Sequence, residues 1–103
     1  MNTDHLRKPT RDWFDSVLES YELEEHHRRL LLAAAECWDQ SQLAREQLAE
    51  GGLTFTDRFG QERPRPQTTI EKDAKILFSR LVRELQLDHE PPRETRIPRQ
   101  SGY

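Results

Sequence analysis

A stretch at residues 51–66 (GGLTFTDRFGQERPRP) most constrains how this 103-residue chain can fold. It separates two long helical patterns and contains two short segments, residues 53–56 and 61–63, that can pair as strands. Asp57-Arg58-Phe59-Gly60 lies between them, and Gly60 can take the positive φ that a tight turn often requires. The stretch therefore predicts two helices joined by a small β-hairpin over residues 53–64.

Two helical patterns precede the hairpin. Trp13, Val17 and Tyr21 fall at i, i+4 and i+8, which predicts a short helix from about residue 10, with its aromatic residues packed as anchors. A longer helix is expected from about residue 23 to residue 50, because its first turn is acidic and Gly51-Gly52 follows as a stop. Its candidate packing residues are Leu30, Ala34, Trp38 and Leu48. The small residues among its apolar positions would let another helix come close.

A third helix should follow the hairpin. Thr68 and Glu71 match a capping box, so we expect the helix to begin there. Its apolar positions recur at helical spacing and should pack on the second helix; they are Ile70, Ala74, Leu77, Phe78, Leu81 and Leu85. Beyond residue 88, prolines are frequent and large apolar residues are scarce, so this segment cannot fold alone.

The predicted fold class is therefore mainly α: a short N-terminal helix, then two long antiparallel helices connected by a small β-hairpin, then an extended tail. We expect a flexible arm over residues 1–9, a helical oligomerisation domain over residues 10–87 and a tail over residues 88–103. Hydrophobic residues make up only 33% of the chain, and an elongated helix pair leaves an apolar stripe uncovered. Self-association, in a ring-type oligomer, would cover that stripe.

Composition restricts the compartment. No run approaches the roughly 18 to 20 apolar residues that a membrane span needs, and no leader resembles a signal peptide. The single cysteine, Cys37, excludes a disulfide within one chain. We therefore expect a cytoplasmic protein without a membrane partner.

Charge is unevenly distributed, although the net charge is only −3. Thirteen of the sixteen basic residues are arginine, whose planar fork suits phosphate and carboxylate recognition. Arginines crowd the hairpin beside Phe55 and Phe59, an arrangement that can touch phosphate and stack on bases. The candidate DNA-binding residues are Arg58, Arg63 and Arg65 of the hairpin, followed by Arg7, Lys8 and Arg11 of the arm. Arg93, Arg96 and Arg99 in the tail are candidates for contacting a partner.

A purely structural interpretation of the hairpin is also open. In it, Phe55 or Phe59 packs on the helix ends and the arginines pair with Asp57 and Glu62. Little in the sequence points to catalysis: His26 and His27 are adjacent on a helix and point about 100° apart, and no nucleophile, phosphate-loop or zinc motif occurs. We expect no enzyme activity, no metal and no cofactor.

Residues 33–88 resemble the small subunit of tailed-phage terminases, in the branch with a long helix, a D-R-x-G hairpin, a proline and a helix opening with E-[KR]-D-A. This similarity covers a little over half of the chain. The matching positions are Trp38, Ala44, Gly52, Leu53, Asp57, Gly60, Pro66, Glu71, Asp73, Ala74, Phe78, Leu81, Glu84, Leu85 and Asp88.

The resemblance implies a role in viral DNA packaging. Such a subunit assembles as a ring, recognises double-stranded viral DNA and delivers it to the large subunit, which holds the ATPase and nuclease. The family has no catalytic residues of its own to carry over. A protein-binding adaptor without DNA contact is the competing hypothesis, because residues 12–27 carry six acidic residues and no lysine or arginine.

Overall fold

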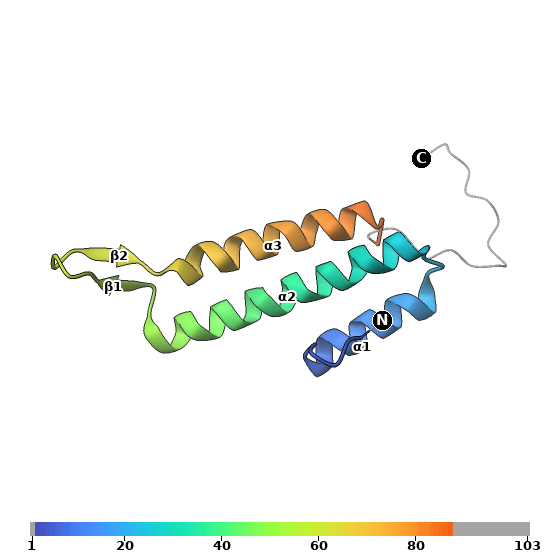
Figure 1. The fold of residues 1–103 in the computed structure, drawn as a ribbon, viewed down its shortest axis with the longest axis horizontal. Coiled ribbons are helices and arrows are strands. Elements are labelled where there is room, and N and C mark those ends of the chain that lie inside the picture. Colours follow the sequence, from blue (N-terminus) through green and yellow to red (C-terminus); the bar gives the residue numbers. More distant parts are fainter. Residues whose placement is uncertain (1, 88–103) are drawn as a thin grey trace.

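The computed structural model describes residues 2–87 and contains three helices and one β-hairpin in that range. Helix α1 spans Lys8–Ser20, α2 spans Glu25–Gly51 and α3 spans Pro66–Glu84. Strands β1 (Thr54–Thr56) and β2 (Glu62–Pro64) join α2 to α3. Helices α2 and α3 run antiparallel, and the hairpin projects beyond their ends (Figure 1). The mainly α fold with two long helices and a connecting hairpin is confirmed.

The hairpin is antiparallel, with Phe55 opposite Arg63 at its centre. The Gly60 N–H donates to the Asp57 carbonyl at 3.0 Å, and Gly60 has a φ of 78°. This conformation is easy for glycine and costly for other residues. The expected turn is therefore confirmed at Gly60.

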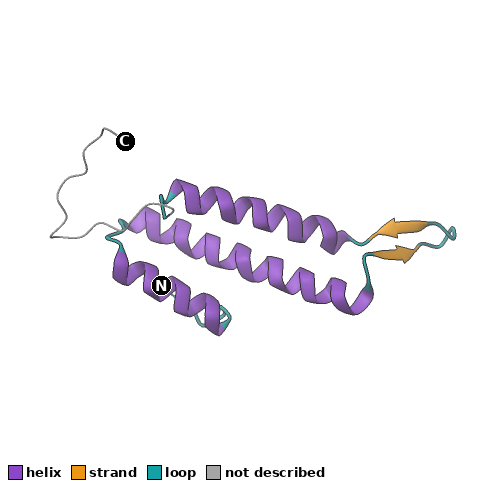
Figure 2. Cartoon of the chain, turned by 180° about the vertical axis from the view of Figure 1, so that it is seen from behind, coloured by secondary structure: helices purple, strands orange, loops and turns teal. Residues whose placement is uncertain are grey.

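Helix α2 is the central element, about 40 Å long at 1.5 Å per residue. Figure 2 shows α3 along one side of it and α1 beside its first half. Small residues on α2, namely Ala34, Ser41 and Ala44, are buried, as is Ala74 of α3. Without bulky side chains at these positions, the two helix backbones can approach closely, as the small-residue pattern predicted.

The hydrophobic core lies where α1 meets the helix pair. Leu31 is fully buried there, together with Phe14 and Val17 of α1 and Leu85 at the end of α3. Leu31 is the central α2 residue of this core, and the predicted packing residue Leu30 is partly buried against it. Neither α2 nor any other helix in residues 2–87 is long and apolar enough to span a membrane.

Three expectations about the ends of elements were wrong. Helix α1 begins at Lys8, and α3 begins at Pro66 with no side chain capping it. In both helices a proline lies in the first turn, where its missing N–H costs nothing and its fixed φ suits the helix. Residues 2–7 are also not a free arm, because Leu6 is 4% exposed in the core.

The predicted packing stripe of α3 is only partly buried. Ala74 and Leu85 are buried, and Phe78 and Leu81 are partly buried, whereas Ile70 and Leu77 remain 39% and 46% exposed. A single facing helix covers only a narrow stripe of α3, so positions at its edge stay in solvent. The tail over residues 88–103, including Arg93, Arg96 and Arg99, lies outside the described residues.

Candidate functional site

The tip of the hairpin is organised by the carboxylate of Asp57. It accepts hydrogen bonds from the backbone N–H groups of Phe59 at 2.8 Å and Gln61 at 3.0 Å, and from Arg63 Nε at 3.0 Å. The hydrogen bond from the Gln61 backbone, helped by Arg63, lowers the pKa of Asp57 below its usual value. The carboxylate therefore stays charged and holds the tip in one shape.

The three hairpin arginines are spread from the tip of the hairpin to its base and have different partners. Arg63 pairs with Asp57, and Arg65 Nε donates to the Gly51 carbonyl at 3.0 Å. Arg58 lies over the Phe59 ring, with its guanidinium carbon 4.9 Å from the ring centre, and both residues are exposed. Phe59 is 72% exposed, so it does not pack on the helix ends. Arg58 and Phe59 together form a projecting basic and aromatic tip.

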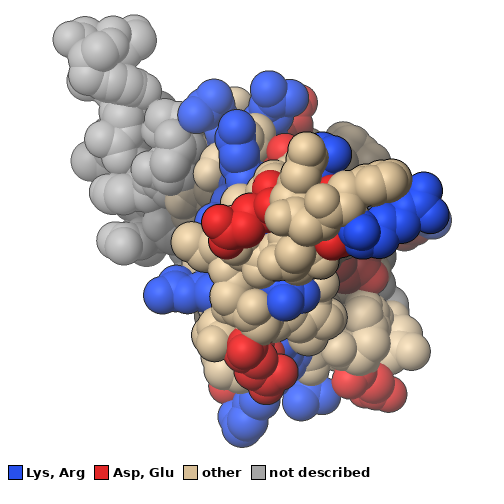
Figure 3. Space-filling model, turned by 90° about the vertical axis from the view of Figure 1, so that its left-hand side faces the viewer, with Lys and Arg blue, Asp and Glu red and all other residues tan. Residues whose placement is uncertain are grey.

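Charge around the hairpin is mixed. Figure 3 looks onto the hairpin end of the molecule and shows basic and acidic side chains interspersed. Besides the Arg63 and Asp57 pair, Thr54 donates to Glu62 across the strands at 2.9 Å. The hairpin therefore presents arginine side chains within a surface of both signs.

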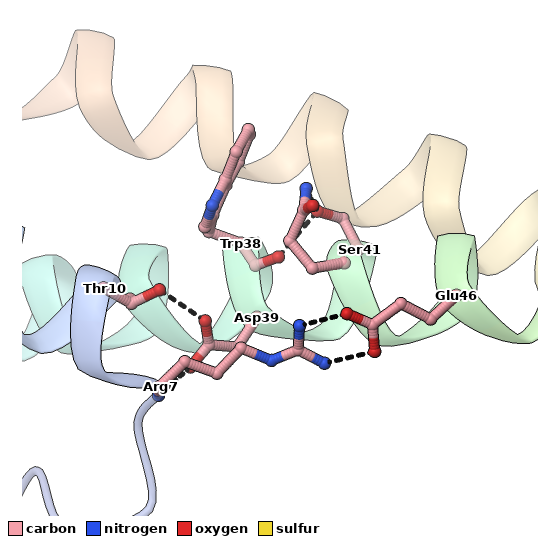
Figure 4. Close-up of polar contacts among 7 residues, drawn as sticks. Arg7, Thr10, Trp38, Asp39, Ser41 and Glu46 are labelled. Carbon is pink, nitrogen blue, oxygen red and sulfur yellow. Dashed lines mark hydrogen bonds and ion pairs between the residues drawn. The ribbon is translucent and has the colours of Figure 1, made fainter.

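Two of the three basic candidates near the N-terminus, Arg7 and Lys8, are paired with carboxylates of the same chain. Arg7 forms two hydrogen bonds to Glu46, at 2.7 Å and 3.0 Å (Figure 4). This contact raises the pKa of Arg7 and lowers the pKa of Glu46. Lys8 pairs with Asp12 at 2.9 Å, and Arg11 is partly buried. The structure does not bring this group to the hairpin.

Asp39 is a functional candidate that no sequence pattern indicated. Its carboxylate, on α2, accepts a hydrogen bond from the Arg7 backbone N–H at 2.9 Å and another from the Thr10 hydroxyl (Figure 4). These groups belong to the first turn of α1, which has no capping side chain of its own. Asp39 therefore caps α1 from a neighbouring helix, and its negative charge suits the positive end of the helix dipole. No local motif signals this, because the partners are 29 and 32 residues away.

An apolar groove of about 300 Å³ lies where the three helices meet. It is lined by Pro9, Thr10 and Trp13 of α1, Trp38 of α2 and Phe78 of α3. The Phe78 ring centre lies 5.7 Å from that of Trp13 and 5.1 Å from that of Trp38. Trp38 remains 37% exposed. Trp13, Trp38 and Phe78, which the sequence predicted as packing residues, thus contact one another and also line an open groove.

Other large apolar side chains are exposed in two places. Leu53, Phe55 and Phe59 lie on the hairpin; Leu43, Ile70, Ile76 and Leu77 lie on α2 and α3. Single exposed apolar residues are normal on a protein surface; these residues are the candidates for contact with another chain.

One group in residues 2–87 has potential metal ligands close together. Glu24, His26 and His27 at the start of α2 place their ligand atoms within 4.8 Å of one another, and the two rings are 4.1 Å apart. The two rings lie closer together than expected from side chains that point about 100° apart on a helix. The group is mostly exposed, and exposed acidic groups are common without a metal ion.

The chain matches no protein-family model, no curated protein and no solved structure.

Proposed function

We propose that this chain is the small subunit of a viral DNA-packaging terminase: a non-catalytic, oligomeric adaptor that recognises double-stranded viral DNA and presents it to the large subunit. The observation that carries the proposal is the antiparallel pair α2 and α3 with its projecting hairpin. The segment that resembles that family forms this pair and its hairpin, in the order that the resemblance implies. The adaptor would work in the host cytoplasm, where viral genomes are packaged.

Assembly into a ring is part of this proposal. Exposed apolar residues on both the hairpin and the helices favour contacts between copies. Light scattering or native mass spectrometry should give a particle of several chains, and a monomer at micromolar concentration would refute the ring. Replacing Ile76 by Lys should lower the particle mass, whereas replacing Arg28 on the exposed face of α2 by Ala should not.

DNA contact by the hairpin rests on Arg58, Arg63 and Arg65. In a ring each copy repeats these residues, so many weak phosphate contacts add together. The triple substitution to Ala should weaken binding and reduce the salt slope by about 0.9 for each phosphate that the hairpin no longer neutralises. A matched control removes three positive charges from α2, at Arg28, Arg29 and Arg45. If the hairpin variant binds DNA as the wild type does, the site belongs to Arg7, Lys8 and Arg11 or to the tail.

The competing function is a helical protein-binding adaptor without direct DNA contact. The net charge of −3 favours it, as does the pairing of Arg7, Lys8 and Arg63 with carboxylates of the same chain. A gel shift at low salt, with and without the large subunit, separates the two functions. A shift with the chain alone supports DNA recognition, and no shift in either mixture supports the pure protein adaptor.

A further inference from the structure

We infer that the groove formed by Pro9, Thr10, Trp13, Trp38 and Phe78 is the docking site for the proline-rich segment that follows Leu87 in the same chain. The groove is open, almost entirely apolar and built from three aromatic rings contributed by three helices. Grooves lined by aromatic residues bind proline-rich peptides, because an extended proline segment loses little entropy on binding and packs its rings against flat side chains.

The described chain ends beside the helix that carries this groove. The Tyr21 hydroxyl, directly after α1, donates to the Leu87 carbonyl at 3.3 Å. Trp13 lies eight residues back along the chain from Tyr21, about 12 Å at 1.5 Å per residue. An extended proline segment covers about 3.1 Å per residue, so Pro91 and Pro92 can reach the level of Trp13 in four to five residues. Sixteen residues follow Leu87, more than this path requires.

Both tryptophans of the chain line the groove, so their fluorescence reports on it directly. In the full chain, replacing Pro91 and Pro92 by Asp should place charge where the groove is apolar and expel the segment. We expect stronger acrylamide quenching and a shift of the emission to longer wavelength. The matched control, Gln100→Asp with Ser101→Asp, adds the same charge beyond the docked prolines and should leave both readings unchanged. None of these substitutions touches the helices, so the fold is preserved.

A peptide of residues 88–103, added in trans, gives a second readout. A tethered segment competes at an effective concentration near the millimolar range, so the peptide should bind the Pro91→Asp, Pro92→Asp chain and not the wild type. Equal quenching in the wild type and this double variant would overturn the inference. So would a groove that responds to a proline-rich peptide of foreign sequence but not to residues 88–103, since the occupant would then be another protein. Neither readout depends on DNA binding or ring formation.

Discussion

Removing the Asp39 carboxylate should loosen α1 from the rest of the molecule. Asp39→Ala deletes two hydrogen bonds to the first turn of α1, one from a backbone N–H and one from Thr10. Loss of a helix cap costs about 0.5–2 kcal/mol, and hydrogen bonds to a charged group contribute about 1.5–3 kcal/mol. The two ranges describe the same hydrogen bonds and are not additive. We therefore expect a loss of about 1–3 kcal/mol in the free energy of unfolding.

The assay is urea unfolding followed by tryptophan fluorescence and by far-UV circular dichroism at one fixed protein concentration, because self-association changes apparent stability. Thermal unfolding gives a second measure, because a 100-residue domain loses about 4–8 °C in Tm for each kcal/mol of stability. Hydrogen exchange locates the effect: amides of α1 should exchange faster, whereas those at the centre of α2 should change less.

Two further variants sharpen the test. Asp39→Asn keeps an acceptor for one of the hydrogen bonds and should lose less stability than Asp39→Ala. Glu46→Gln weakens only the exposed ion pair with Arg7 and should have a smaller effect still. If Asp39→Ala unfolds within about 0.5 kcal/mol of the wild type, as an ordinary surface substitution does, and α1 exchange is unchanged, Asp39 does not cap α1.

Two predictions concern the hairpin. The pKa of Asp57 is lowered in the folded chain, so the carboxylate stabilises the hairpin above its ordinary pKa of 3.8, and this stabilisation is lost as the pH falls through the lower folded pKa. In an acid titration, the Phe59 and Gln61 amides should therefore exchange faster over this pH range. An Asp57→Asn chain should show no such pH-dependent change. Gly60→Ala should destabilise the hairpin by about 1–2 kcal/mol because of its positive φ alone, since no atom lies within 4 Å of the added methyl. Gly60→Asn should cost less, because asparagine tolerates that φ, and equal losses for both variants in thermal unfolding would contradict the conformational explanation.

Sequence periodicity predicted the elements well because each depends on neighbours in the chain. Apolar residues three and four apart specify the inner faces of α2 and α3, and Asp57 and Gly60 specify a turn within four residues. Helices α1 and α3 begin earlier in the chain than expected, because each has a proline in its first turn. A proline in the first turn is typical of the beginning of a helix, because its fixed φ suits the helix and its missing N–H is not needed there.

The candidate site was less predictable because it depends on contacts across the fold. The sequence indicated Arg7 as a candidate DNA-binding residue, but it could not show that Arg7 pairs with Glu46, 39 residues away. No sequence pattern indicates the role of Asp39, which depends on how α1 packs on α2. By contrast, Trp38 and Phe78 were expected to pack, and their rings do contact each other. Periodicity could not reveal that Trp13 joins them to form an open groove.

The location of the exposed apolar residues bears on how copies would assemble. Leu53, Phe55 and Phe59 lie on a hairpin that projects past the helix ends, whereas Leu43 and Ile76 lie on the helices themselves. A two-fold dimer covers both groups when the hairpin of each copy lies on the helices of the other. A head-to-tail contact, with the hairpin of one copy on the helices of the next, covers both groups and repeats in one direction. Such a contact closes into a ring when its rotation divides a full turn, so the particle mass distinguishes the two arrangements: two chains for the dimer, and several for the ring that we propose.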